Sequence, residues 1–353
     1  MMFWTDHDAA SLSAWLADRG HKPSHAPRLL RSFYAGDGDA GFADLDLPKS
    51  LRPVLNTELL PRRSSIAART VAGDGTTKLL LALPDGAAVE TVLMPDAFRP
   101  DRAAGCASSQ VGCAMGCDFC ASTKRGLERN LAAGEIVEQF LSLRAEARRL
   151  GRKLQTLVFM GMGEPMHNLA EVLAAVRRIA GGGMGELGWR QVTVSTVGIV
   201  PGIDALAASG LNVHLALSLH APDDATRAAI VPSNRRYPVA DVAAAARRYQ
   251  DRTNRIVTIE YCLLAGVNDS DEQAELLAAL VRGWRAHVNL IPYNATGPGV
   301  SGRCYDRPTV ERVAGFLGIL RDRGVVAHVR RTRGDDAAAA CGQLRETYVA
   351  LGA

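Results

Sequence analysis

Residues 112–120, GCAMGCDFC, place three of the seven cysteines of this 353-residue chain on one short segment. The spacing Cys-x3-Cys-x2-Cys lets a loop turn Cys113, Cys117 and Cys120 toward a single metal centre. A structural zinc site needs a fourth ligand, and no Cys or His pair follows Cys120 at zinc-finger spacing. The triplet therefore predicts a metal centre with one open position, although buried or zinc-binding cysteines are the simpler interpretation of a Cys-x2-Cys pair alone.

The composition is that of a globular protein. Hydrophobic residues make up 47% and charged residues 22%, and the formal charge of +4 permits an anionic partner without requiring one. The N-terminus lacks a basic leader with a cleavage site, and no apolar run reaches the length of a membrane span. We expect a cytoplasmic chain without membrane contact, where reduced thiols favour metal or redox chemistry over structural disulfides.

The first hundred residues divide into two parts. Helical spacing of apolar residues predicts short helices over residues 9–18, 27–34 and 47–59, which form an N-terminal helical module, residues 1–62. From residue 65 to 94 the pattern alternates, with GDGT and PDG as turns, and predicts a small β extension, residues 63–102.

The remaining chain alternates strands with helices. Strands are predicted near residues 154, 191, 212, 255, 286 and 325, and helices over 133–150, 169–179, 203–208, 239–249, 271–282 and 308–323. If residues 106–110 supply the first strand, about six parallel strands form an α/β partial (β/α)6 TIM-like barrel, residues 103–345, before a tail, 346–353. The active site is then expected at the carboxyl ends of the strands.

Several polar or glycine-rich motifs follow those strand ends. Gly161 and Gly163 lack a Cβ, so the backbone of GMGE could approach a ligand closely, although Gly-x-Gly alone is typical of a turn. Ser195, Ser218 and Asn294 offer hydroxyl and amide groups that suit a ribose, a carboxylate or an adenine. His220 is equally compatible with this pocket and with the core.

The triplet, with Phe119 before its last cysteine, resembles the signature of the radical S-adenosylmethionine enzymes. The resemblance implies one 4Fe-4S cluster on Cys113, Cys117 and Cys120, whose fourth iron takes the amino and carboxylate groups of S-adenosylmethionine. It also implies that an electron from the cluster releases a 5'-deoxyadenosyl radical.

Further motifs closely resemble the RlmN/Cfr family of rRNA adenine methyltransferases from about Glu90 to Leu344. They are CASSQVGC, FMGMGEP, STVGIVP, LSLHAP, VTIEY, GVNDS, NLIPYN and RTRGDDAAAACGQL. The resemblance implies that Cys341 carries a methyl group, that Cys106 resolves the intermediate through a transient disulfide, and that Glu90 accepts a proton. It assigns S-adenosylmethionine binding to Gly163, Glu164, Ser195, Ser218, Leu219, His220 and Asn294. More loosely, residues 1–62 resemble the family's RNA-binding module.

The two extra thiols also have a chemical reason. An electron-poor adenine carbon is not nucleophilic enough to attack a sulfonium methyl, whereas a thiolate takes that methyl by displacement. Hydrogen abstraction from the resulting S-methyl would give a carbon radical that adds to the ring, and a second thiolate would release the product by forming a disulfide. Two S-adenosylmethionine molecules are then consumed per turnover. Alone, Cys341 would be a small filler in an alanine-rich run and Glu90 a solvated carboxylate.

The resemblance to the RlmN branch implies methylation of carbon 2 of one adenosine in 23S rRNA and of adenosine 37 of certain tRNAs, by a monomer with a reductant such as flavodoxin. Arginines and lysines near the expected rim, among them Lys124, Arg330 and Arg333, could hold phosphates. Ala295, where the family usually has proline, and the altered 296–304 loop depart from the pattern, and Cys304 has no counterpart.

Three alternatives remain open from the sequence. One is methylation of adenine carbon 8, as in the Cfr branch. Another is a radical enzyme that activates a glycyl radical partner. The third is a zinc-stabilised RNA-binding protein without enzymatic activity.

Overall fold

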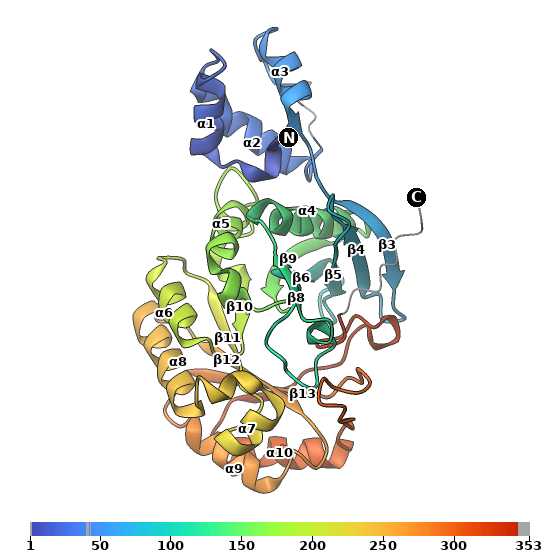
Figure 1. The fold of residues 1–353 in the computed structure, drawn as a ribbon, viewed down its shortest axis with the longest axis vertical. Helices are drawn as coiled ribbons and strands as arrows, with labels where there is room; N and C mark the ends of the chain where they lie inside the picture. The colour runs from blue at the N-terminus through green and yellow to red at the C-terminus, as the bar shows by residue number, and fades with distance from the viewer. Residues whose placement is uncertain (1, 40–41, 43, 345–353) are drawn as a thin grey trace.

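The computed structural model describes residues 2–39, 42 and 44–344, so the predicted tail and the last position of the predicted barrel lie outside the described residues. The three predicted N-terminal helices are present as α1 (Ala9–Ala17), α2 (Ala26–Ala35) and α3 (Leu51–Glu58), and they stand apart at one end of the molecule (Figure 1). Asp8 caps α1 by accepting a hydrogen bond from Ser11 N at 2.8 Å.

Two buried carboxylates help to fix the helical module to the rest of the protein. Asp37 of the module pairs with Arg144 and Arg148 of α4 (Ala133–Arg149). From the opposite side, Glu138 of α4 accepts hydrogen bonds from Thr5 Oγ1 at 2.9 Å and Ser64 N at 2.8 Å. Strand β1 (Met2–Phe3) pairs with β2 (Leu59–Leu60), which closes the module on itself. Because Glu138 is fully buried, these bonds replace the water that its charge would otherwise need.

A ten-stranded sheet with the order β14-β13-β12-β11-β10-β9-β6-β5-β4-β3 forms the body of the protein. Its strands β6 and β9 to β14 pair in parallel, and β3, β4 and β5 join them in antiparallel fashion through β6. The strands are β3 (Ser65–Val71), β4 (Thr77–Ala82), β5 (Ala88–Pro95), β6 (Arg102–Cys106), β9 (Lys153–Phe159), β10 (Val192–Thr196), β11 (His214–Ser218), β12 (Val257–Leu263), β13 (Ala286–Pro292) and β14 (Ala327–Val329). The alternating strand-helix pattern was therefore interpreted correctly, and the predicted β extension continues the barrel sheet.

The first parallel strand lies four residues earlier than predicted. It is Arg102–Cys106, whereas the predicted segment 106–110 leaves the sheet after Cys106. The small residues of this strand allow it to lie under α4, since a Cβ on Gly105 would come within 2.9 Å of Leu143 Cδ1. The next strand, β7 (Gln110–Gly112), pairs instead with β8 (Leu127–Asn130) and frames the cysteine loop.

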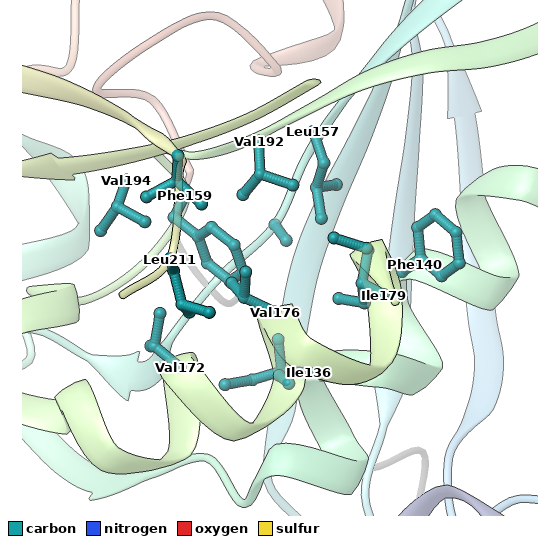
Figure 2. Packing of buried hydrophobic residues seen from close by; sticks show 14 of the residues in the cluster. Ile136, Phe140, Leu157, Phe159, Val172, Val176, Ile179, Val192, Val194 and Leu211 are labelled. Carbon is teal, nitrogen blue, oxygen red and sulfur yellow. The ribbon is translucent and has the colours of Figure 1, made fainter. Parts of the chain in front are cut away.

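Helices cover the outer face of the parallel strands (Figure 1). Besides α4 they are α5 (Leu169–Ala180), α6 (Val200–Ala208), α7 (Asp224–Ile230), α8 (Val239–Thr253), α9 (Asp271–Leu280) and α10 (Val310–Asp322). The sequence pattern missed only α7 among these helices. In Figure 2, Ile136 and Phe140 of α4 and Val172, Val176 and Ile179 of α5 face the strand residues Leu157, Phe159, Val192 and Val194. This packing is the apolar core that holds the strand ends in place.

The antiparallel strands also hold the C-terminal segment. Gly73 N donates to Asp336 Oδ2 at 2.8 Å, and Gly334 N donates to Asp74 Oδ2 at 3.2 Å. The turn between β3 and β4 thereby fixes residues 334–338, just before Cys341. Among the described helices, none combines the length and the apolar character needed to span a membrane.

Candidate active site

The three cysteines of the opening motif lie on a loop that closes on itself between β7 and β8. Cys113 N donates to Gly126 O at 2.9 Å, and Gly116 N donates to Thr123 Oγ1 at 2.8 Å. Gly112 is required at the crossing point, because its φ is +72° and a Cβ there would lie 2.0 Å from Gly126 O. Contacts within the protein thus fix the conformation of the cysteine loop without a bound metal.

Cys113, Cys117 and Cys120 line one cavity, which we call the first cavity. Within the described ranges, no three His, Cys, Asp or Glu side chains converge closely enough to hold a metal ion. Three thiols on one loop that line a common cavity are nevertheless the donor set of an iron-sulfur cluster with one open iron. Desolvation raises the pKa of Cys113 to about 12, so the thiol needs a metal cation to ionise at neutral pH.

The GMGE loop forms the next wall of the first cavity and packs against residues 107–110. A Cβ on Gly163, where φ is +98°, would lie 2.5 Å from Gln110 Cβ, and a Cβ on Gly161 would lie 2.6 Å from Ser108 Oγ. The predicted close approach of this loop to a ligand remains a prediction, and the structure shows that residues 107–110 also need the space beside these glycines. Both glycines also line the cavity.

Glu164 is buried, and its carboxylate is held by backbone amides. It accepts hydrogen bonds from Met166 N at 3.0 Å and Val197 N at 2.9 Å, which joins the GMGE loop to the end of β10. Desolvation raises the pKa of Glu164 to about 7, against the opposing effect of these hydrogen bonds.

The opposite wall of the cavity carries the predicted hydroxyl groups and His220. Ser195 Oγ and Ser218 Oγ, at the ends of β10 and β11, lie 3.2 Å apart. His220 Nδ1 accepts a hydrogen bond from Cys262 N at 3.0 Å, and burial lowers the pKa of His220 to about 3, with Arg227 as a second cause. The imidazole is therefore neutral with its proton on Nε2, a donor that a ligand in the cavity can use.

Two predicted cofactor residues lie elsewhere. Leu219 is buried and does not line the first cavity, and its backbone N donates to Glu260 O at 3.1 Å. Asn294 lines a second cavity, and its Nδ2 donates to Cys341 O at 3.2 Å. Their roles in S-adenosylmethionine binding remain predictions.

Glu260 was not predicted as a site residue and Arg330 was predicted only as a phosphate contact at the rim, yet both line the first cavity. Glu260 accepts a hydrogen bond from Asn289 Nδ2 at 3.0 Å, and Arg330 Nη1 lies 3.8 Å from its other oxygen. Arg330 was expected to meet phosphates at the rim, but it points into the barrel beside Cys341. Glu260 could have been found as the one acid within the apolar strand VTIEYCL.

The second cavity contains the two thiols that the resemblance singled out. Cys106, buried at the end of β6, lines this cavity, and Cys341 lines both cavities. Ala121 N donates to Gly342 O at 2.7 Å, and Ser122 Oγ donates to Leu344 O at 2.6 Å. These bonds attach the segment that carries Cys341 directly to residues that follow Cys120.

Burial controls the reactivity of Cys106. Desolvation, with a smaller contribution from the nearby Cys341, raises its pKa to about 12 against the opposing effect of Arg330. Arg330 is the one Lys or Arg among the described residues that line the first cavity, and it lines the second cavity as well. Its guanidinium is thus the cation placed to favour a thiolate in this part of the site.

Glu90 is buried in β5, so the alternative of a solvated carboxylate is wrong. Lys78 Nζ lies 2.9 Å from Glu90 Oε1 and also donates to Ala338 O at 3.2 Å. Glu90 does not line either cavity, and its role as a proton acceptor remains a prediction.

The altered loop at residues 296–304 is folded onto the cysteine loop. Asp118, between two of the cysteines, accepts hydrogen bonds from Ser301 N at 2.7 Å, Ser301 Oγ at 2.5 Å and Tyr305 Oη at 2.6 Å. Lys124 Nζ donates to Thr296 O, so this predicted phosphate contact is used within the protein. Cys304 is exposed in the same loop.

Comparisons with known proteins agree with this arrangement. Residues 108–278 match the model of the radical SAM superfamily. Over 95% of its length the chain is 60% identical to RlmN 1 of Opitutus terrae, a dual-specificity RNA methyltransferase by name, of which it covers 94%. It is 44% identical to RlmN of Thermosynechococcus vestitus, with 97% of each chain covered.

A solved structure agrees with these relatives. A radical SAM methyltransferase from Sphaerobacter thermophilus superimposes with a TM-score of 0.90 at 46% identity, covering 98% of this chain and 99% of that one. The motifs, the partial barrel and the full-length similarity agree, and the chain belongs to the RlmN family of radical S-adenosylmethionine methyltransferases.

Proposed function

We propose that this protein methylates carbon 2 of an adenine in RNA, in 23S rRNA and at adenosine 37 of tRNA, through a methyl group carried on Cys341. The observation that carries the proposal is the position of Cys341, which lines both the cavity of the three cysteines and the cavity that contains Cys106. The names of the relatives, dual-specificity RNA methyltransferases, support RNA as the substrate.

Cys113, Cys117 and Cys120 would hold the cluster, and the first cavity has the donors for S-adenosylmethionine. The hydroxyls of Ser195 and Ser218 suit a ribose or carboxylate, and the Nε2–H of His220 is a further hydrogen-bond donor. Arg330 is the one Lys or Arg among the described residues that line this cavity. When bound, the cluster supplies the electron that cleaves S-adenosylmethionine to a radical. A one-electron reductant such as flavodoxin would supply that electron, and we expect a monomer that meets its RNA in the cytoplasm.

Cys341 receives the methyl group before the radical step. As a thiolate, its sulfur displaces the methyl of one S-adenosylmethionine and S-adenosylhomocysteine leaves. A hydrogen atom is then removed from this S-methyl group, and the resulting carbon adds to the adenine ring. Because Cys341 lines the second cavity, an adenine bound there meets that carbon without moving the thiol.

Cys106 and Glu90 would complete the reaction. Glu90 accepts the proton that leaves ring carbon 2, and because the carboxylate lines neither cavity, water would carry this proton. Cys106, as a thiolate, attacks the sulfur of Cys341, the sulfur–carbon bond breaks, and the released carbon takes a proton to become the methyl group. The one unpaired electron that the radical addition left on the adduct must leave in this step, and the oxidised cluster would be its acceptor. The two thiols end as a disulfide, which a cellular reductant must open before the next turnover.

The test is the position of the methyl group. Anaerobically reconstituted protein, S-adenosylmethionine and unmodified RNA are combined, and the digested RNA is analysed by mass spectrometry against 2-methyladenosine and 8-methyladenosine standards. We expect 2-methyladenosine in 23S rRNA and tRNA. 8-Methyladenosine would support the Cfr-like alternative, and a colourless zinc protein that leaves RNA unmodified would support the non-enzymatic one.

A further inference from the structure

The second cavity has an aromatic side chain at its outer end. Phe98 lines this cavity and is 85% exposed, whereas Cys106, which also lines it, is 7% exposed. The cavity therefore leads from a buried thiol to a solvent-exposed aromatic ring. A single exposed apolar side chain is common on protein surfaces, so the neighbours of Phe98 decide what it means.

The turn that carries Phe98 is held in a defined conformation. Asp96 Oδ1 accepts hydrogen bonds from Phe98 N at 2.8 Å and from Arg99 N at 3.1 Å. Asp96 N donates to Arg102 O at 2.9 Å, which closes the turn at the start of β6. Arg333 donates to Pro95 O from across the cavity. The ring is thus presented to solvent by a structured turn.

The surroundings of Phe98 are positively charged. Arg330, Arg331 and Arg333 line the same cavity, and Asp96 is the one acidic side chain among its described lining residues. Arg331 is exposed and makes no hydrogen bond or ion pair with any described residue. Phe98 and Arg331 thus line one cavity, and an aromatic face together with an unpaired guanidinium is a combination that binds single-stranded nucleic acid.

We propose that Phe98 stacks on the base of a nucleotide next to the target adenosine, while Arg331 binds the phosphate backbone at the mouth of the cavity. This inference rests on the proposed function, because an adenosine that reaches Cys341 must leave its stack. When the adenosine leaves the stack, the faces of the two neighbouring bases are exposed to solvent. An aromatic side chain can stack on such an exposed base face whatever the base is. Phe98 and Arg331 thereby select single-stranded RNA over a duplex.

The test measures RNA binding without turnover. The holoenzyme binds a fluorescein-labelled RNA hairpin that carries the adenosine 37 anticodon loop, and fluorescence anisotropy gives the dissociation constant. We expect Phe98→Ala to raise the Kd about 10-fold and Phe98→Trp to stay within about two-fold of the wild type. Val310→Ala is the matched control, since Val310 is 80% exposed and lines neither cavity. Cleavage of S-adenosylmethionine in the absence of RNA should be unchanged in all three variants.

A second arm identifies the stacked base. The hairpin is prepared with an abasic site on either side of the target adenosine. With wild-type protein, one of these RNAs should bind about 10-fold more weakly. With Phe98→Ala the same abasic site should have no further effect, because ring and base act as a pair. Equal losses in both proteins would show that Phe98 touches no base.

The outcomes separate this inference from the proposed function. Phe98→Ala binding as tightly as Val310→Ala would overturn the stacking role, even where the RNA is methylated on carbon 2. Normal stacking with no methyl transfer would defeat the proposed function alone. A wild-type protein that binds neither this hairpin nor 23S rRNA would defeat both.

Discussion

Lys78 joins Glu90 to the segment that carries Cys341. Its Nζ lies 2.9 Å from Glu90 Oε1 and 3.2 Å from the carbonyl oxygen of Ala338. Glu90 is 3% exposed, so the ammonium of Lys78 helps to compensate a carboxylate that is removed from water. The antiparallel strands β4 and β5 therefore do more than extend the sheet, because they support the C-terminal thiol.

Replacing Lys78 by Met should destabilise the protein and displace Cys341. Breaking a buried ion pair from one side leaves a desolvated charge, and we expect a loss of about 3 kcal/mol in the free energy of unfolding. Lys78→Arg keeps the charge and should recover most of the stability. Thermal unfolding, together with the rate at which Cys341 acquires its methyl group, checks both effects. Equal melting temperatures for Lys78→Met and the wild type would contradict this account of the pair.

Removing the carboxylate of Asp118 should free the 296–305 loop and expose the cluster. Asp118→Ala deletes the acceptor of three hydrogen bonds, whereas Tyr305→Phe deletes one donor and should have a smaller effect. We expect Asp118→Ala to lose iron several-fold faster in air and to be cleaved in this loop by a protease. Iron content and digestion time courses measure both; unchanged rates would show that the loop does not protect the cluster.

Gly163 should tolerate no side chain. Gly163→Ala places a Cβ 2.5 Å from Gln110 Cβ at a φ of +98°, so the GMGE loop must move away from residues 107–110. Gly151→Ala is the matched control, because its φ is +68° and nothing lies within 4 Å of the added Cβ. We expect the control to cost about 1 kcal/mol and Gly163→Ala to cost more and weaken S-adenosylmethionine binding. Calorimetric binding of S-adenosylmethionine and thermal unfolding distinguish the two variants. Equal losses of stability for Gly151→Ala and Gly163→Ala would contradict the predicted clash with Gln110.

Glu164 and His220 should give opposite pH dependences of stability. Desolvation lowers the pKa of His220 from 6.5 to about 3, so below pH 6.5 the unfolded chain binds a proton that the folded chain excludes. The contribution of His220 therefore falls as the pH drops. Desolvation raises the pKa of Glu164 from 4.5 to about 7, so its contribution is full below pH 4.5 and is lost as the pH rises through 7.

Between pH 4.5 and 6.5 the two effects on the free energy of unfolding oppose each other. A variant that lacks one of the two groups should therefore show the pH dependence caused by the other. Relative to the wild type, Glu164→Gln should lose about 1.4 kcal/mol per unit of acidification, and His220→Gln should gain a similar amount. Melting temperatures at several pH values, at equal iron content, provide the measurement. Parallel curves for the wild type and both variants would mean that these groups titrate normally in the folded protein.

The sequence was sufficient for the barrel and the cysteine loop because both depend on local patterns. Alternation of apolar strands with helices located the parallel strands, and the spacing of Cys113, Cys117 and Cys120 located the loop. The first strand was misplaced because the small residues of Arg102–Cys106 give a weak apolar signal. Contacts between distant segments, such as Lys78 with Ala338, depend on the three-dimensional fold and have no signature in the sequence.

Arg330 illustrates the same limit at the site. In the sequence it is one of several arginines before Cys341, and the charge alone suggests a phosphate contact. Arg330 follows β14, which pairs with β13, and in the folded protein its Nη1 lies 3.8 Å from Glu260 Oε2 and it lines the second cavity together with both thiols. The residue type therefore predicted the positive charge of Arg330 but not its partner, Glu260.

The most direct test of a methyl-carrying Cys341 uses Cys106→Ala. Without the second thiol, the carbon bridge between Cys341 and the adenine cannot be released. We expect anaerobic reaction of this variant with RNA to accumulate a covalent protein–RNA adduct, which mass spectrometry of digested protein assigns to the peptide that contains Cys341. Free 2-methyladenosine formed at the wild-type rate, or an adduct on any other residue, would contradict the account.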